Sequence, residues 1–528
     1  MSTQADARTG ETPAPRPVAA IPGRRTFAII SHPDAGKTTL TERLLLAGGA
    51  IHAAGEVKAR GQARRARSDW MKIEQQRGIS VTSSVMTFER DGLLFNLLDT
   101  PGHEDFSEDT YRTLTAVDSA VMVIDAAKGI EAQTLKLFEV CRLRSVPIIT
   151  FINKVDREGK SPFALLDEIA DKLALDVCPM SWPVGLGGEF EGLWDIERKR
   201  LQRPDGSLAE GDLQQLVSGP IHERVSEELE LAEMGYPAFD PTAYRHGDLT
   251  PVYFGSALRE IGVEPLIEAL ARFAPGPRPQ PATPAPVNPD SKTVTGFIFK
   301  VQANMNPMHR DRVAFMRLCS GKFKRGMRLN QVGMGKQIAV HSPVLFFARD
   351  RELAEEAYPG DIIGIPNHGT LRVGDTLTDG PDVTITGLPN FAPEILRRVV
   401  LKDPTKTKQL KKALDDMAEE GVIQLFNPAI GAQTVVGVVG QLQLEVLISR
   451  LDVEYKVEAK LEASPYDTAR WVASDNPAAL KKLMEEHRSQ MAGDRDDHPV
   501  FMAKDLWDLN YIQSRHPDVR FSATRERT

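Results

Sequence analysis

The peptide Ser31-His32-Pro33-Asp34-Ala35-Gly36-Lys37-Thr38 lies between the apolar run Phe27–Ile30 and the helix-forming segment Thr39–Leu45. This order predicts a strand, a tight loop and a helix start, which is the context of a phosphate-binding P-loop. Backbone N–H groups of such a loop, with the helix N-terminus behind it, favour a polyphosphate. We expect the whole stretch from Ser31 to Thr39 to bind it, with Lys37 at the β/γ-phosphates and the Thr38 hydroxyl on Mg²⁺. Because Ser31 replaces the usual first glycine, this stretch alone does not decide the function.

A second candidate stretch follows the apolar run Leu94–Leu98 and reads Asp99-Thr100-Pro101-Gly102-His103. The Asp99 carboxylate at the strand end can hold Mg²⁺ directly or through water. Gly102 lacks a Cβ, so its backbone can turn and offer its N–H to a γ-phosphate. His103 then stands where a residue that positions the attacking water is needed.

The third stretch, Asn153-Lys154-Val155-Asp156, ends another apolar run. A carboxylate such as Asp156 can accept two hydrogen bonds from guanine, whereas adenine has no such donor pair. Loss of hydrogen bonds of this kind is worth about 10⁴–10⁵ in discrimination. We expect the Asn153 amide and the Lys154 stem to pack around the base.

The fourth stretch, Ser256-Ala257-Leu258, offers small residues and backbone N–H groups to the guanine O6. It is a weak signal alone, but the four stretches occur in the required order along alternating predicted strands and helices. The sequence therefore predicts a P-loop α/β domain, with a mostly parallel sheet covered by helices on both faces, that binds GTP/GDP and hydrolyses GTP.

The segment Glu74–Thr82 lies where an effector loop would close over the γ-phosphate. Such a loop needs a hydroxyl for Mg²⁺ and is ordered by the γ-phosphate. Ser80 is our candidate ligand, and Thr82 is an alternative that the sequence leaves open. The run Arg77-Gly78-Ile79-Ser80 resembles the effector loop of the translational GTPases. That resemblance implies that His103 positions the attacking water, with Ile79 and Pro33 flanking it.

The length, the cysteine content and the apolar runs of the chain limit the number of domains and the cellular compartment. The chain of 528 residues predicts two to four domains. Its three cysteines, without a Cys-x-x-Cys spacing, indicate a reducing cytoplasm rather than a disulfide framework. No apolar run approaches the roughly 20 residues of a membrane span, so we expect no membrane partner.

The net charge is −8, yet basic residues cluster in three places that could contact RNA phosphates. One cluster falls in Lys58–Arg67 of the predicted effector region. The other two consist of Lys322, Lys324, Arg325 and Arg328, and of Arg397, Arg398, Lys402, Lys406, Lys408, Lys411 and Lys412.

Changes of pattern along the chain predict four parts. Residues 1–23 form a polar, disordered tail without the apolar core of a signal peptide. Residues 24–280 form the GTP-binding domain, with an insertion near 185–240 and a proline-rich linker at its end. Residues 281–392 show the short strands of an all-β barrel. Residues 393–528 alternate helices and strands and form a C-terminal α/β domain, with helices expected over 406–420 and 441–451.

This organisation, the stretch Arg24–Thr39, the effector loop and the later Gly437–Val446 together resemble the release factor 3 family, the bacterial class II termination factors. The likeness spans nearly the whole chain from Arg24, and Ser31 fits this family. It implies a ribosome-dependent GTPase that promotes dissociation of class I release factors after peptide release, without reading stop codons. Its expected ligands and partners are GTP/GDP, Mg²⁺, the ribosome and class I release factors, and we expect a monomer.

Three other functions stay open at this point. Another translational GTPase, such as elongation factor G or a ribosome-protection protein, would carry further C-terminal domains, for which residues 393–528 leave little room. A P-loop small-molecule kinase would not need Asn153, Lys154 and Asp156 for guanine. A nucleotide-gated RNA-binding scaffold would not need His103 for turnover.

Overall fold

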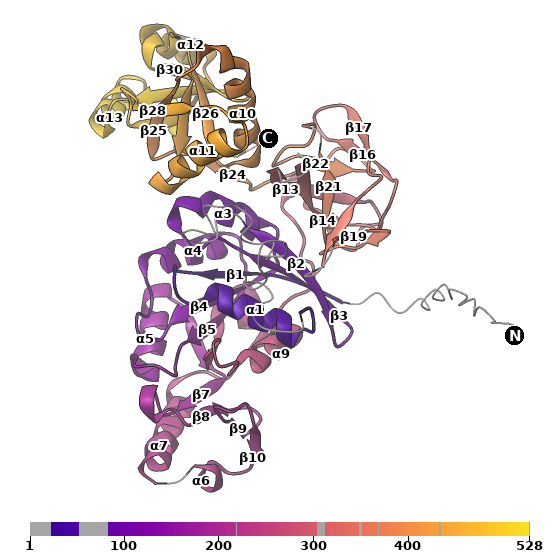
Figure 1. Cartoon of the computed structure of the whole chain (residues 1–528), viewed down its shortest axis with the longest axis vertical. Coiled ribbons are helices and arrows are strands. Elements are labelled where there is room, and N and C mark those ends of the chain that lie inside the picture. The colour runs from indigo at the N-terminus through magenta and orange to yellow at the C-terminus, as the bar shows by residue number, and fades with distance from the viewer. Residues whose placement is uncertain are drawn as a thin grey trace, which may run out of the picture.

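The computed structural model describes residues 23–51, 83–217, 219–303, 312–347, 351–367, 369–431 and 434–526. These residues form three domains (Figure 1). We call them the first domain (β1 to α9, Gly23–Phe273), the second domain (β12 to β23, Ala282–Ile385) and the third domain (β24 to β33, Pro389–Glu526). The expected disordered tail, the effector segment and the cluster Lys58–Arg67 lie outside the described residues, apart from Gly23, which begins β1.

The first domain is built on a seven-stranded sheet in the order β2-β3-β1-β4-β5-β11-β6. All neighbours are parallel except β2, which pairs antiparallel with β3 at one edge. The strands are β1 (Gly23–Ser31), β2 (Ser84–Arg90), β3 (Leu93–Asp99), β4 (Ser119–Asp125), β5 (Ile148–Asn153), β6 (Asp176–Pro179) and β11 (Leu249–Gly255). The central strands β4 and β5 are buried along their whole length and mostly apolar, because helices cover both faces of the sheet.

Two helix layers bury this sheet. On one face pack α1 (Lys37–Ala47) and α9 (Val263–Phe273), with Leu40 and Leu266 in a core with Phe27. On the other face pack α3 (Ser107–Thr115), α4 (Ala132–Leu143) and α5 (Pro162–Leu173). The predicted P-loop α/β architecture is confirmed.

A four-stranded antiparallel sheet, in the order β10-β9-β8-β7, extends from the first domain beside β6 and β11. Its elements are β7 (Ser181–Val184), η2 (Gly187–Glu189), β8 (Gly192–Asp195), β9 (Arg200–Gln202) and β10 (Leu208–Glu210), followed by α6 (Leu213–Leu216), α7 (Pro220–Gly235) and α8 (Pro241–His246). Figure 1 shows β7–β10, α6 and α7 at the end of the molecule away from the third domain.

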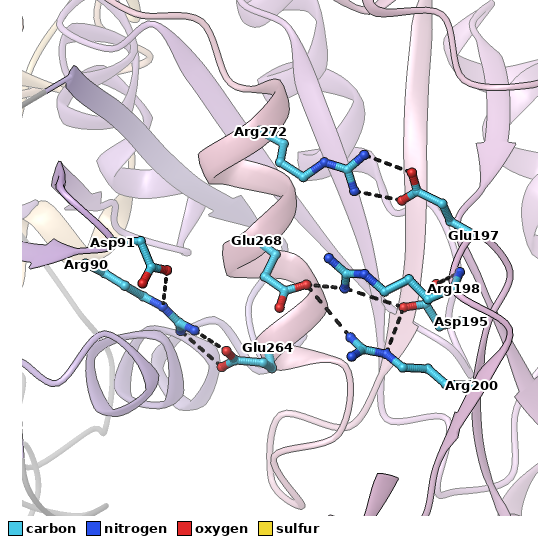
Figure 2. A network of polar contacts seen from close by, with 9 residues as sticks. All are labelled: Arg90, Asp91, Asp195, Glu197, Arg198, Arg200, Glu264, Glu268 and Arg272. Atoms are coloured by element: carbon cyan, nitrogen blue, oxygen red, sulfur yellow. Dashed lines mark hydrogen bonds and ion pairs between the residues drawn. The ribbon is translucent and has the colours of Figure 1, made fainter. Parts of the chain in front are cut away.

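Ion pairs along α9 attach this sheet to the parallel sheet (Figure 2). Charged side chains on successive turns of α9 face partners on β2 and on the β8–β9 hairpin. The pairs are Glu264 with Arg90, Glu268 with Arg198 and Arg200, and Arg272 with Glu197. Since these side chains are partly exposed, each pair contributes little, at most about 1 kcal/mol.

The second domain is all-β, as predicted. Its main sheet has the order β17-β16-β22-β13-β14-β21-β18-β19, with antiparallel pairing between neighbours. Its strands are β12 (Ala282–Thr283), β13 (Thr295–Ala303), β14 (Arg312–Ser320), β15 (Phe323–Lys324), β16 (Arg328–Gln331), β17 (Lys336–Ala339), β18 (Val344–Phe346), β19 (Arg351–Leu353), β20 (Glu356–Ala357), β21 (Ile362–Pro366), β22 (Thr376–Thr378) and β23 (Thr384–Ile385).

The third domain combines helices with an eight-stranded sheet in the order β28-β25-β27-β26-β30-β31-β29-β32. Both helices predicted here are present. The elements are β24 (Pro389–Phe391), β25 (Ile395–Leu401), η3 (Pro404–Lys406), α10 (Thr407–Glu420), β26 (Gln424–Pro428), β27 (Val435–Val438), α11 (Gln441–Val453), β28 (Ala459–Ala463), β29 (Thr468–Ala473), α12 (Pro477–Glu486), η4 (Arg488–Gln490), β30 (Met491–Asp494), β31 (Pro499–Ala503), α13 (Leu506–Arg515), β32 (Arg520–Ser522) and β33 (Thr524–Glu526).

Candidate guanine-nucleotide site

The loop between β1 and α1 turns sharply at Gly36, the N-cap of α1. Gly36 has φ of 101°, in the left-handed region that favours glycine. A Cβ at this position would lie 2.2 Å from Nδ2 of Asn153. Both the conformation and the close approach of Asn153 therefore require a glycine, and the loop backbone lies directly against the third predicted stretch.

A buried ion pair joins the first and second predicted stretches. Lys37 Nζ lies 2.6 Å from Asp99 Oδ1, and the two side chains are only 6% and 3% exposed. Thr100 Oγ1 donates to the Ile29 carbonyl at 2.7 Å, which holds the end of β3 against β1. Lys37, at the start of α1, fits a phosphate, and Asp99, at the carboxyl end of β3, fits a magnesium ion.

The Asn153 amide is the meeting point of three predicted stretches. Its Nδ2 donates to the Ala35 carbonyl at 2.8 Å. Its Oδ1 accepts from the N–H groups of Lys154 and Ala257, each at 2.9 Å. The Ala257 N–H is thus engaged by Asn153, and in this arrangement it positions the Ser256–Leu258 stretch. Leu258 is 58% exposed, while Ser256 and Ala257 are buried.

Lys154 and Asp125 form a second, partly exposed connection to the loop. Lys154 Nζ donates to the Asp34 carbonyl at 2.5 Å and to Asp125 Oδ2 at 2.6 Å. Burial alone would raise the pKa of Asp125, but hydrogen bonds from Lys154 and the Ala127 N–H hold that pKa below its ordinary value. Our sequence reasoning missed Asp125, although it ends an apolar strand just as Asp99 does.

The Asp156 carboxylate is 7% exposed and pairs with Arg259 Nε at 3.1 Å. Val155 is fully buried beside it. Arg259, half exposed, was also missed, although it directly follows the Ser256–Leu258 stretch. The carboxylate that we assign to guanine is therefore buried, and in this arrangement it is occupied by Arg259.

The stretch around His103 lies against the P-loop. A Cβ built on Gly102 would lie 3.7 Å from Pro33 Cα and 3.8 Å from Lys37 Cε, which are ordinary contacts, and Gly102 does not have a positive φ. The turn itself therefore does not require this glycine. His103 is 38% exposed and begins η1 (Glu104–Phe106), where its Nδ1 accepts from the Asp105 N–H at 3.3 Å.

Two buried polar atoms at the start of the loop fit a bound ligand. Ser31 Oγ and His32 Nδ1 have no hydrogen-bond partner among the described residues. His32 Nε2 meanwhile lies 3.2 Å from Glu131 Oε1. Since buried polar groups are almost always paired, these atoms favour a ligand or water at this end of the loop. The candidate ligands Ser80 and Thr82 lie outside the described residues.

Several cations of the two described basic clusters have acidic partners. Lys322 pairs with Glu356, Arg325 with Glu355, and Lys402 with Glu458. The local positive charge is therefore lower than the sequence alone indicated.

Comparisons with known proteins agree with the fold. Residues 23–276 match the elongation factor Tu GTP binding domain family, residues 293–380 match elongation factor G domain 2, and residues 385–513 match the class II release factor RF3 C-terminal domain. The fold and the matched families define a translational GTPase.

The chain is 52% identical, over 516 residues, to peptide chain release factor 3 of Bordetella petrii, covering 95% of this chain and 96% of that protein. It belongs to the peptide chain release factor 3 family. The family places it in translation termination, binding guanine nucleotides and acting on the ribosome.

A crystal structure of a protein from Thermus thermophilus superposes with a TM-score of 0.69 at 25% identity, covering 90% of this chain and 72% of that one. Within the part of the chain that the structure describes, no helix combines the length and apolar character needed to cross a membrane.

Proposed function

We propose that this translational GTPase promotes the dissociation of class I release factors from the ribosome after peptide release, without stop-codon specificity. It acts as a monomer in the cytoplasm. One observation supports the proposal: the P-loop and Ala257 both bond to Asn153, in a chain whose third domain is of the class II release factor type.

In this proposal the Thr38 hydroxyl, Asp99 and the Ser80 hydroxyl would hold magnesium, with Thr82 as the alternative effector-loop ligand. The ion supplies charge neutralisation at the β- and γ-phosphates when bound. Lys37, now paired with Asp99 at 2.6 Å, turns to the phosphates when the nucleotide enters.

His103 orients the attacking water. Its ring is only partly buried, at 38% exposure, so ribosomal contacts can reach and reorient it. GTP orders the effector loop, and the ordered form binds one ribosomal state more tightly, which is a ligand-driven shift of population. Hydrolysis then returns the protein to the form that leaves the ribosome.

The direct test measures how fast a labelled class I release factor leaves post-release ribosomes when the protein is added with GTP or with GDP. We expect a GTP-dependent acceleration. Equal rates with both nucleotides, while GTP is still hydrolysed on ribosomes, would keep the GTPase and reject the termination step that we assign to it.

Guanine recognition has its own test in Asp156→Asn. The change replaces an acceptor by a group that also donates, so we expect affinity to shift from GTP towards xanthosine triphosphate, with a loss for GTP on the order of 10²-fold or more. Filter-binding titrations with both nucleotides measure it. Wild-type affinity for GTP would remove Asp156 from base recognition.

A further inference from the structure

The helix α11 of the third domain has no N-cap side chain to accept an N–H of its first turn, although the Gln443 side chain accepts from the Val439 and Gly440 N–H groups just before it. Its N-cap is Gly440, whereas helices favour Ser, Thr, Asp or Asn there to accept an N–H of the first turn. The acceptor comes from the first domain instead: Asp105 Oδ2 accepts from the Leu442 N–H at 2.6 Å. A carboxylate at the N-terminus of a 13-residue helix also interacts favourably with the helix dipole.

The glycine at position 440 is explained by this contact. Its φ of −141° is extended backbone that any residue adopts. A Cβ there would, however, lie 2.0 Å from Asp105 Cγ. An alanine is therefore compatible with the backbone of α11 and incompatible with the docked Asp105.

The backbone N–H of the same aspartate holds the imidazole of His103, and the bond of its carboxylate to α11 fixes where that N–H lies. Asp105 Oδ1 lies 3.4 Å from His103 Nδ1, and the Asp105 N–H donates to that nitrogen at 3.3 Å. A neutral ring that accepts at Nδ1 carries its proton on Nε2, which leaves Nε2–H free to face water. Asp105 is only 13% exposed, so its position is tightly determined.

A second contact holds the helix that follows. Glu108 Oε1 accepts from the Phe391 N–H at 3.2 Å and from Gln424 Nε2 at 3.0 Å, both in the third domain. Figure 1 shows α3 at the top of the first domain, facing α11 and β24. The segment after His103 is therefore attached to the third domain at two points, on successive turns.

We propose that Asp105 is a positioning residue through which the docked third domain sets the orientation of His103, so that hydrolysis is fast only while the N-terminus of α11 is seated on Asp105. The inference rests on the role of His103 in the proposed function and adds the regulation of that site by another domain.

The test compares ribosome-stimulated, single-turnover GTP hydrolysis by the full-length wild type, Gly440→Ala and Asp105→Ala. We expect both variants to be slower by roughly tenfold, within the 5–150-fold range typical of coupling between sites, with unchanged GTP affinity. Asp105→Asn keeps an acceptor for the Leu442 N–H and is expected to recover most of the rate. Gly493→Ala in β30 is the matched control, because a Cβ there meets only ordinary contacts, the nearest at 3.6 Å.

A double-mutant cycle distinguishes positioning from a merely structural effect. On a His103→Ala background, neither Gly440→Ala nor Asp105→Ala is expected to slow hydrolysis further, because their effect passes through the missing ring. Additive losses, or wild-type rates in both single variants, would overturn the proposal. If Gly440→Ala does not fold, Asp105→Ala alone tests the proposal, because it removes atoms and creates no steric clash. A wild-type rate in His103→Ala itself would instead reject the role of His103. Failure of the proposed function can therefore be distinguished from failure of the proposed role of Asp105.

Discussion

The first domain contacts its two neighbours through different chemistry. Towards the second domain it buries ion pairs: Arg317 Nη2 lies 2.5 Å from Asp118 Oδ2, with side chains 1% and 0% exposed. Arg24 pairs with Asp361 in the same region. Towards the third domain, in contrast, the carboxylates of Asp105 and Glu108 accept mainly from backbone and amide N–H groups.

This difference indicates which of the two interfaces of the first domain separates more readily. Parting a buried ion pair leaves a charge without its partner, which costs several kcal/mol. Parting a carboxylate from an N–H group costs less, about 1.5–3 kcal/mol for a hydrogen bond to a charged group. We therefore expect the contact between the first and third domains to separate more readily than the contact between the first and second domains. The third domain is also held to the second domain, by the ion pairs of Arg312 with Asp416 and Glu419.

The largest expected effect comes from Arg317→Met. It preserves the volume and leaves Asp118 buried without its closest partner, so the free energy of unfolding should fall by about 3–5 kcal/mol. Urea denaturation followed by tryptophan fluorescence measures it. Arg325→Met is the control, because Arg325 is 41% exposed and pairs with the exposed Glu355, a contact worth at most about 1 kcal/mol. Similar losses in both variants would contradict the contrast between the interfaces.

A smaller effect is expected from Lys300→Met, at a contact between the first and second domains. Lys300 Nζ lies 3.4 Å from Asp109 Oδ2 and donates to the Ser83 carbonyl. Loss of such charged contacts should lower the free energy of unfolding by about 1.5–3 kcal/mol at pH 7.

The pH dependence sharpens this prediction. Burial would raise the pKa of Asp109, but the charge of Lys300 and hydrogen bonds from Ser83 hold it below its ordinary value. A lowered pKa in the folded state stabilises the fold above the unfolded pKa of about 3.9, and this stabilisation is lost as the pH falls through the folded pKa. Unfolding free energies at pH 7, 5 and 3.5 should thus converge for wild type and Lys300→Met at low pH. A constant difference would contradict the assignment.

At the interface between the first and third domains, Gln424→Met removes the amide N–H that Glu108 accepts at 3.0 Å. It should cost only about 1 kcal/mol, because Glu108 keeps its bond from the Phe391 N–H and its buried ion pair with Arg112. The expected result is about fivefold faster hydrogen exchange at the Phe391 amide, with no change in exchange within the central strands of the first domain. Unchanged exchange at Phe391 would indicate that this contact does not hold the third domain.

The smallest effect is expected far from both interfaces, in the pairs along α9 (Figure 2). Arg272 and Glu197 contact each other at 2.7 Å, and each is nearly half exposed. Their hydrogen bond lowers the pKa of Glu197, but screening by water limits its value, so Glu197→Gln should change stability by about 0.5 kcal/mol or less. Thermal melts in low and high salt check this, and a loss comparable to that of Arg317→Met would contradict it.

The sequence by itself determined the class of domain and the order of the site. The P-loop, Asp99, Asn153 and Ser256 could be recognised because each occupies a short stretch with a defined place after an apolar strand. The carboxyl ends of parallel strands meet at one edge of a sheet, so these stretches had to converge. Asp125 follows the same rule and could have been predicted.

Only the tertiary structure decided which groups join the domains. Asp105 and Leu442 are separated by 337 positions, as are Arg24 and Asp361, and no local pattern marks either pair. Gly440 looks like an ordinary helix start until the carboxylate of another domain is placed 2.0 Å from its missing Cβ. Local spacing encodes strands, loops and helix caps within one segment, whereas a cap supplied by a distant segment depends on how whole domains pack.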